Sequence, residues 1–290
     1  MICFVYELNP SIGSGHFMRC KSVQETLMQK FGIPSQLLAE TDFNASDWHQ
    51  AIVVFDLFDT AKTTKFLRDT SNENVKICFD YFSNEEQPDL NISVLEQFHE
   101  KRSHPNYTGL DYCVLRPDFL KNPVLKEKLN EVFVYIGGNG FPEVVRTIAD
   151  KFSDSPFHFN LIRNQNSLDC GPLPDNFSVH FLPENLIELM NRSTFAITSP
   201  GLATMELLYL QVPSVLCPLI DFHEYFSDFL LQEDLAISRL DDFDSRLLEN
   251  LPRMRESARK KVDGKGVERI IHLMLNAYEE KMGSRYPLWA

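Results

Sequence analysis

Residues 2–31, which read ICFVYELNPSIGSGHFMRCKSVQETLMQKF, decide the fold class of this chain. The run opens with ICFVY, a short apolar stretch typical of a buried strand. A glycine-containing turn follows, and from His16 to Phe31 apolar residues recur at helical spacing until Gly32, a residue that commonly ends helices. A strand, a glycine turn and an amphipathic helix in this order predict the first βα unit of a parallel sheet.

The same alternation continues along the chain and predicts an α/β fold with two Rossmann-like domains. The pattern loosens around residues 116–128, so we expect an N-terminal domain over 1–128 and a C-terminal, nucleotide-binding domain over 129–280, with a ligand cleft between them. Residues 245–281 read as helical, with breaks at Pro252 and Gly264. The expected strands are 2–7, 35–39, 51–57, 75–79, 91–95 and 111–115, then 131–136, 158–162, 179–182, 195–198 and 214–217.

Composition narrows the possible partners. The chain has 290 residues, 43% of them hydrophobic, and a formal net charge of −13, which argues against general binding to nucleic acid or anionic membranes. No segment approaches the roughly 20 apolar residues of a membrane span, and the first residues show no basic n-region and no cleavage site, so we expect no signal peptide. The six cysteines contain no C-x-x-C pair. We therefore expect a reduced cytoplasmic protein without membrane insertion, present as a monomer or weak dimer.

The first candidate site is the turn between the first strand and helix. Gly13 and Gly15 allow close approach of a ligand, and the N–H groups at the helix start, with Ser14, can face a phosphate or a sugar oxygen. His16 stands at the rim of that helix, where a neutral imidazole can act as a general base, and Arg19 lies one turn later. The alternative is a tight turn with a surface histidine. Met18 occupies the third glycine position of the dinucleotide motif, which disfavours NAD.

Two further loops have the composition of anion sites. Gly137, Gly138 and Asn139 follow an apolar strand and predict a backbone nest, or else a flexible connection. Gly201, Leu202, Ala203 and Thr204 open a later helix, and Glu206 lies near its start. That carboxylate can accept hydrogen bonds from a ribose diol, although stabilisation of the helix through its dipole explains it equally well.

Four stretches together resemble the PseG-type nucleotide-sugar hydrolases of pseudaminic acid biosynthesis, over roughly residues 1–235. These enzymes remove UDP from UDP-2,4-diacetamido-2,4,6-trideoxy-β-L-altropyranose. Spore-coat polysaccharide proteins share the pattern, and the MurG-like glycosyltransferases share it more distantly. The stretches are IGSGHFMRC (12–20), LDYCVLRPDF (110–119), VYIGGNG (134–140) and NLIELMNRSTFAITSPGLATMELLYLQVPSV (185–215).

The resemblance implies a GT-B-like fold, with the C-terminal helices packing back across the first domain. It implies that His16 activates water for attack at the sugar anomeric carbon, with release of UDP or another nucleoside diphosphate. Glu206 would hold the ribose and the glycine nests the diphosphate, with no cofactor and no metal. Arg19, Asp80, Tyr81 and His223 would be candidates for the sugar pocket.

The chain departs from the family pattern at several places. Tyr6–Pro10 replaces an Arg-Ala-Asp-Ala-Ser-like stretch, and Asp80-Tyr81 replaces a pair of aspartates. Pro200 replaces the first of two glycines and removes an N–H donor. Asp221–Glu224 adds charge where an Asn-Gln pair is typical. These differences leave two alternatives to hydrolysis open, which are a glycosyl or other group transferase and a non-catalytic nucleotide-sugar binder.

Other polar residues favour structural roles. Asp56 and Asp59 follow an apolar strand, and we expect them to cap a helix rather than line the cleft. The remaining histidines that we considered lack the mutual spacing of metal ligands; they are His99, His104, His158, His180 and His223.

Overall fold

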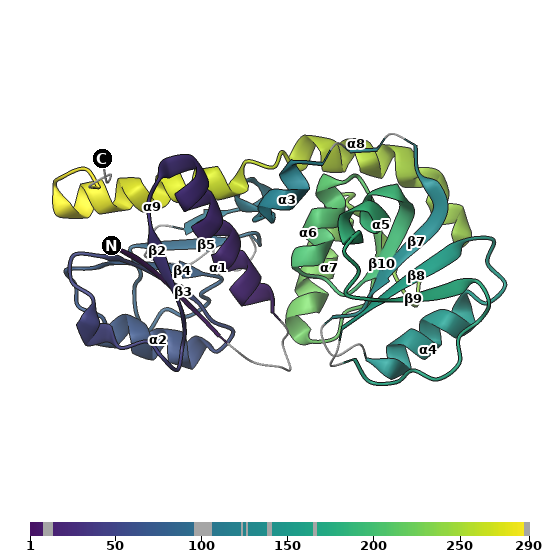
Figure 1. Cartoon of the computed structure of the whole chain (residues 1–290), viewed down its shortest axis with the longest axis horizontal. Helices are drawn as coiled ribbons and strands as arrows, with labels where there is room; N and C mark the ends of the chain where they lie inside the picture. Colours follow the sequence, from purple (N-terminus) through teal and green to yellow (C-terminus); the bar gives the residue numbers. More distant parts are fainter. Residues whose placement is uncertain are drawn as a thin grey trace. The chain divides into compact units, whose positions relative to one another are not determined.

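The computed structural model describes residues 1–7, 14–95, 106–122, 124–125, 127–137, 141–164 and 167–286. Contacts within the chain divide it into two compact units. The described residues of Met1–Leu8, Ser14–Pro117 and Gly264–Ala290 form the first unit, and those of Asp118–Asp263 form the second. Each unit holds one six-stranded sheet in which every neighbouring pair is parallel. The two-domain α/β fold class is therefore confirmed (Figure 1).

The first sheet has the strand order β2-β1-β3-β4-β5-β6. Helices α1 and α9 lie on one face and α2 on the other (Figure 1). The elements are β1 (Ile2–Tyr6), α1 (Gly15–Thr26) with a π-helical extension (Leu27–Phe31), β2 (Ser35–Ala39), β3 (Ile52–Asp56), α2 (Thr60–Asp69), β4 (Val75–Phe79), β5 (Leu90–Ser93), β6 (Asn106–Thr108) and α9 (Gly266–Met282).

The second sheet has the order β12-β11-β10-β7-β8-β9. The short helix α3 (Pro117–Leu120) lies where the chain passes from the first unit to the second. The elements that follow are β7 (Leu129–Tyr135), α4 (Pro142–Lys151), β8 (His158–Arg163), β9 (Phe177–Phe181), α5 (Leu186–Arg192), β10 (Ser193–Thr198), α6 (Leu202–Tyr209), β11 (Ser214–Leu216), α7 (Asp221–Gln232), β12 (Ala236–Arg239) and α8 (Leu251–Lys261).

Local sequence explains the elements that carry the first sheet. Strands β3 and β4 are buried along their whole length, as expected of central strands covered on both faces. Helix α2 begins after Asp59, whose side chain accepts hydrogen bonds from the N–H groups of Ala61 and Lys62. The helical segment after β1 ends at Gly32, which adopts a left-handed conformation with φ of 66°. The capping role predicted for Asp59 is confirmed.

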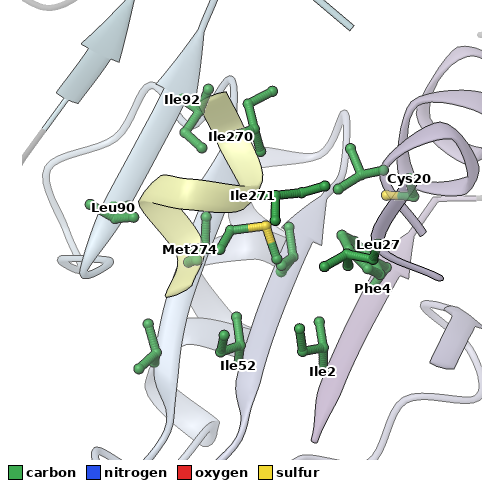
Figure 2. Packing of buried hydrophobic residues seen from close by; sticks show 14 of the residues in the cluster. Ile2, Phe4, Cys20, Leu27, Ile52, Leu90, Ile92, Ile270, Ile271 and Met274 are labelled. Carbon is green, nitrogen blue, oxygen red and sulfur yellow. The ribbon is translucent and has the colours of Figure 1, made fainter. Parts of the chain in front are cut away.

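Helix α9 completes the core of the first unit although it comes from the far end of the chain. Ile270, Ile271 and Met274 are fully buried and pack on apolar side chains of the sheet and of α1. Figure 2 shows Ile270 beside Ile92, with Ile271 and Met274 between Ile92 and Ile52 in this view. At the start of the helix, Gly266 lies directly on the backbone of Cys113. The first sheet therefore depends on α9, together with α1, for the layer that covers one of its faces.

Several predicted elements differ from the structure. Residues 111–115 were predicted as a strand, but a 3-10 turn (Leu110–Tyr112) begins after Gly109, whose φ is 104°. The backbone after this turn is covered by α9 rather than by a neighbouring strand. Pro252 was predicted to break a helix, but it lies in the first turn of α8, where its missing N–H is tolerated. The prediction omitted β6, α3, α7 and β12.

Two further findings concern the whole described chain. No helix among the described residues is long and apolar enough to span a lipid bilayer. All six cysteines are buried and unbridged.

The close contact between Gly266 and the backbone of Cys113 allows a test of how α9 packs on the first unit. A Cβ on this residue would lie 2.1 Å from the carbonyl oxygen of Cys113 and 2.8 Å from its backbone nitrogen. We expect Gly266→Ala to destabilise the protein by about 1–3 kcal/mol or more, because overpacked backbone contacts must shift apart. Thermal denaturation measures the loss. Asn276→Ala on the exposed side of the same helix is the control, with a change within about 0.5 kcal/mol. Equal midpoints for both variants would contradict this packing.

Candidate active site

Four polar side chains meet at the carboxyl end of the first sheet. His16 and Arg19 come from the first turns of α1, Asp56 is the last residue of β3, and Asp80 follows β4 directly. Strands β1, β3 and β4 are neighbours, and the register pairs Tyr6 at the end of β1 with Asp56. Parallel strands end on the same edge of a sheet, and ligands of open α/β sheets bind beyond that edge.

Asp56 is the centre of this group. Its Oδ1 lies 2.6 Å from His16 Nδ1 and accepts a hydrogen bond of 2.5 Å from one terminal nitrogen of Arg19. Its Oδ2 accepts a second bond from Arg19 Nε at 2.7 Å, and the thiol of Cys20 lies 3.7 Å from the same oxygen. The guanidinium thus holds the carboxylate with two parallel bonds, which is the strongest geometry for such a pair.

The protonation state of Asp56 follows from its surroundings. The residue has no solvent exposure, and burial alone would raise its pKa. The charge of Arg19 and the interaction with His16 outweigh burial and hold the pKa of Asp56 well below its usual range. Asp56 is therefore an ionised carboxylate at neutral pH and accepts hydrogen bonds without donating any.

An ionised Asp56 determines the tautomer of His16. Because the carboxylate only accepts, Nδ1 of His16 carries the proton in their 2.6 Å hydrogen bond. In a neutral imidazole the second nitrogen, Nε2, then holds the lone pair and can accept a proton. The side chain of His16 is 19% exposed, so solvent and small ligands reach it. A base oriented by a buried carboxylate is the arrangement that activates a hydroxyl group or water.

Arg19 links the two aspartates. Its other terminal nitrogen donates to Asp80 Oδ2 at 2.5 Å, and Asp80 Oδ1 accepts a hydrogen bond of 2.7 Å from Ser93. The guanidinium also lies over the ring of Phe79, with 4.8 Å to its centroid. Burial lowers the pKa of Arg19, but Asp56 and Asp80 together raise it well above its usual value. Arg19 therefore stays charged and connects the ends of β3 and β4.

The structure places the other predicted residues of the first unit as follows. Ser14 and Gly15 are exposed at the start of α1. Asp80 has a positive φ of 50° and belongs to the network around Arg19. Tyr81 is 1% exposed, and its hydroxyl lies 2.9 Å from Thr64 on α2. Gly13 lies outside the described residues.

Two residues of this group were not recognised from the sequence. Asp56 was predicted to cap a helix, and this is wrong, because its carboxylate binds His16 and Arg19 instead. Ser93 was not considered, although its hydroxyl holds Asp80. The usable signal was that each follows or ends an apolar strand, where side chains gather at one edge of a parallel sheet.

In the second unit, Gly137 follows β7 in a left-handed conformation, with φ of 61°. A Cβ on it would lie 3.6 Å from Ser199 Oγ and 3.8 Å from a methyl carbon of Leu219, so the loops after β7, β10 and β11 meet there. The N–H of Leu219 donates to His223 Nδ1 at 3.2 Å, and burial lowers the pKa of His223 to about 4. His223 is thus neutral near pH 7 and carries its proton on Nε2. Gly138 and Asn139 lie outside the described residues.

Helix α6 begins beside this group. Thr204 Oγ1 accepts the N–H of Gly201 at 3.2 Å and lies within hydrogen-bonding distance of the Ser199 carbonyl. The N–H groups of Leu202 and Ala203 precede the first hydrogen bond within the helix, so their direction suits an anion at the helix start. Glu206 is 1% exposed in the following turn.

The charged stretch Asp221–Glu224 forms the first turn of α7. Acidic residues are favourable at a helix N-terminus, and Glu224 also binds Arg239 at 2.8 Å. The negative charge of the stretch Asp221–Glu224 therefore has a structural explanation. Among the residues that the structure describes, no three His, Cys, Asp or Glu side chains are grouped so that they could hold a metal ion.

Comparison with known protein families gives no matching family model, and no curated protein matches the sequence. Solved structures of glycosyltransferases have a similar fold. MurG from Acinetobacter baumannii matches 95% of this chain over 99% of its own, with a TM-score of 0.54 and 11% identity. The spinosyn forosaminyltransferase SpnP matches 93% of this chain over 98% of its own, with a TM-score of 0.59 and 11% identity.

The spinosyn rhamnosyltransferase SpnG, solved in complex with thymidine diphosphate, matches 99% of this chain over 98% of its own, with a TM-score of 0.53 and 11% identity. At 11% sequence identity, these similarities to solved structures show a shared fold and nothing more. The chain thus has the GT-B-like architecture of these glycosyltransferases, and its closer resemblance to PseG-type hydrolases stays a prediction.

Removing the charge of Asp56 tests the network directly. Asp56→Asn keeps the shape but leaves the half-buried Arg19 with one carboxylate fewer, so we expect a loss of about 3–5 kcal/mol in the free energy of unfolding at neutral pH. Because the folded state lowers the pKa of Asp56, its stabilisation is complete above about pH 4, the ordinary pKa of an aspartate, and is lost as the pH falls further.

Urea denaturation between pH 2 and 7 measures the difference between Asp56→Asn and the parent. Asp244→Asn is the matched control, because hydrogen bonds from Arg246 lower the pKa of Asp244 to about 2 although that pair is exposed. The control should change stability far less. An equal effect of both substitutions, or a difference that does not shrink in acid, would contradict the network.

Proposed function

We propose that this chain is an enzyme that transfers the glycosyl group of a nucleotide sugar, with His16 as the general base. The observation that carries the proposal is the pair of His16 and the buried, ionised Asp56 at the carboxyl end of the first sheet. The pair supplies a proton acceptor whose free nitrogen faces away from the carboxylate. The GT-B-like fold, shared with the glycosyltransferases described above, supports the choice of a nucleotide sugar.

The reaction follows from these groups. Nε2 of His16 takes the proton of an acceptor hydroxyl while the acceptor oxygen bonds to the anomeric carbon. The bond between that carbon and the diphosphate oxygen breaks, and the nucleoside diphosphate leaves with the electron pair. Asp56 stabilises the imidazolium that forms, as a carboxylate does beside a catalytic histidine. A proton thus moves from acceptor to His16, and the glycosyl group moves from diphosphate to acceptor.

The diphosphate gains negative charge as it leaves, and backbone N–H groups are suited to stabilise it. We assign this role to Gly13, Ser14 and Gly15, to Gly137–Asn139, and to Gly201–Thr204 at the start of α6. His223 supports the sugar end of the assignment, because a neutral imidazole with a proton on Nε2 donates a hydrogen bond to a sugar oxygen.

Hydrolysis is the second candidate, and the GSGH motif at residues 13–16 favours it through the resemblance to PseG-type enzymes. Water would take the place of the acceptor hydroxyl, and the same base would serve. The likeness to solved glycosyltransferases supports transfer over hydrolysis. A new glycoside among the products identifies transfer, and free sugar without a glycoside identifies hydrolysis.

Substitution of His16 tests the proposal. Purified protein is incubated with UDP-, dTDP- and CMP-sugars, with and without simple alcohol acceptors, and nucleotide release is measured. We expect His16→Ala to lower kcat by about 10²–10⁴-fold, the usual contribution of a general base, without weakening nucleotide binding. His49→Ala, an exposed histidine of the same unit, is the control. Turnover of His16→Ala at the parent's rate would overturn the mechanism.

Discrimination between UDP and 2′-deoxy-UDP tests Glu206. A hydrogen bond to a charged group contributes about 1.5–3 kcal/mol, so we expect the parent to bind UDP about tenfold to hundredfold more tightly by calorimetry. Glu206→Gln should lose most of this preference, whereas the exposed Glu184→Gln keeps it. Equal affinities in the parent would exclude a ribose contact at Glu206.

A further inference from the structure

Glu7 forms hydrogen bonds with the main chain at Asp56 and in the loop that follows it, but none with the Asp56 carboxylate. Glu7 is the first residue after β1, and its backbone N–H donates to the carbonyl of Asp56 at 3.3 Å. Its side-chain Oε2 accepts the N–H of Phe58 at 2.9 Å and that of Asp59 at 3.0 Å. One residue therefore holds the main chain at Asp56 and immediately after it.

The carboxylate of Glu7 is buried and paired with a cation. Glu7 is 4% exposed, and Oε1 accepts a hydrogen bond of 3.1 Å from the ammonium group of Lys62 on α2. Lys62 binds Glu40 at the same distance, and the N–H of Glu40 in turn donates to the carbonyl of Tyr6 at the end of β1. The ends of β1 and β3 and the start of α2 are thereby connected through a single side chain.

The side chain at position 7 must accept hydrogen bonds from two backbone N–H groups. The N–H groups of Phe58 and Asp59 are adjacent and converge on one oxygen of the buried Glu7 side chain, and a part-buried donor that loses such a partner costs free energy. An alanine at position 7 would leave both donors without this acceptor, whereas a glutamine would still present a carbonyl oxygen. The loop that carries Asp56 therefore depends on the chemistry of position 7 rather than on packing alone.

We propose that Glu7 is a positioning residue for the pair of His16 and Asp56. Asp56 orients the imidazole through one hydrogen bond of 2.6 Å, so a small rotation of the main chain at Asp56 turns the base away from the acceptor oxygen. Glu7 prevents that rotation by holding the peptide groups around Asp56. The catalytic consequence rests on the function proposed above, but the effect on His16 exists in the protein without a substrate.

The first measurement uses the protein alone. In nitrogen-15 histidine-labelled protein, the parent should show His16 with its proton on Nδ1 and slow exchange of that proton, as an ionised Asp56 requires. Glu7→Ala should lose this signal or mix the two tautomers. Glu7→Gln should keep it, and Lys62→Met, which leaves the acceptor of the loop in place, should keep it too. Asp56→Asn gives the reference for complete loss.

The second measurement is kinetic. We expect Glu7→Ala to lower kcat about tenfold to hundredfold, the scale of a misplacement near one ångström, with KM for the nucleotide sugar nearly unchanged. Glu7→Gln should restore most of the rate. Glu7→Asp, whose carboxylate is one methylene shorter, gives an intermediate rate and serves if the alanine variant does not fold.

The outcomes separate the two proposals. If Glu7→Ala, or Glu7→Asp in its place, keeps the parent's Nδ1 proton signal, Glu7 does not position His16, whatever the enzyme does. If the parent releases no nucleotide from any nucleotide sugar, the proposed function fails, and the tautomer measurement still decides the role of Glu7. A loss of thermal stability with an unchanged His16 signal would show a structural role alone and would overturn the inference.

Discussion

The carboxylate of Asp56 has no access to solvent, and an ionised group in that position is stable only where cations and donors surround it. Arg19 supplies the charge through two hydrogen bonds, and His16 supplies a third donor. Because these partners keep Asp56 ionised, the proton of the shared hydrogen bond belongs to His16, and in a neutral imidazole the outer nitrogen is left with the lone pair. The chemistry of the site thus follows from one buried charge.

The fold places that charge at a useful position. In a parallel sheet the carboxyl ends of β1, β3 and β4 share one edge, and the helix after β1 begins above it. Asp80 and Ser93 extend the network along the edge, and Glu7 secures the main chain around Asp56. Helix α9 covers this sheet, so residues from the end of the sequence support a site built near its beginning. The packing of α9 therefore stabilises the sheet whose edge carries the site.

The sequence predicted the fold class because strand and helix periods alternate so regularly, and strands β2 and β4 have the expected bounds. His16 and Arg19 were found because they stand beside a glycine turn. Asp56 was misinterpreted because aspartate is a preferred residue at the start of a helix, where Asp59 does act as a cap. Asp56 differs from Asp59 because it lies within β3, where it pairs with Tyr6 of β1. A single sequence does not reveal which strands pair or in which register. Helix α7 was missed because its first turn is acidic and was interpreted as ligand chemistry.

The central claim is that an oxygen activated by His16 attacks the anomeric carbon of a nucleotide sugar. Turnover of a nucleotide sugar that carries oxygen-18 between the anomeric carbon and the phosphorus, with an alcohol acceptor present, tests it most directly, because mass spectrometry locates the label in the products. The account predicts the label on the released nucleoside diphosphate and none on the glycoside, with the reaction slowed in His16→Ala. Label on the sugar product would place the broken bond between phosphorus and oxygen and would contradict the account.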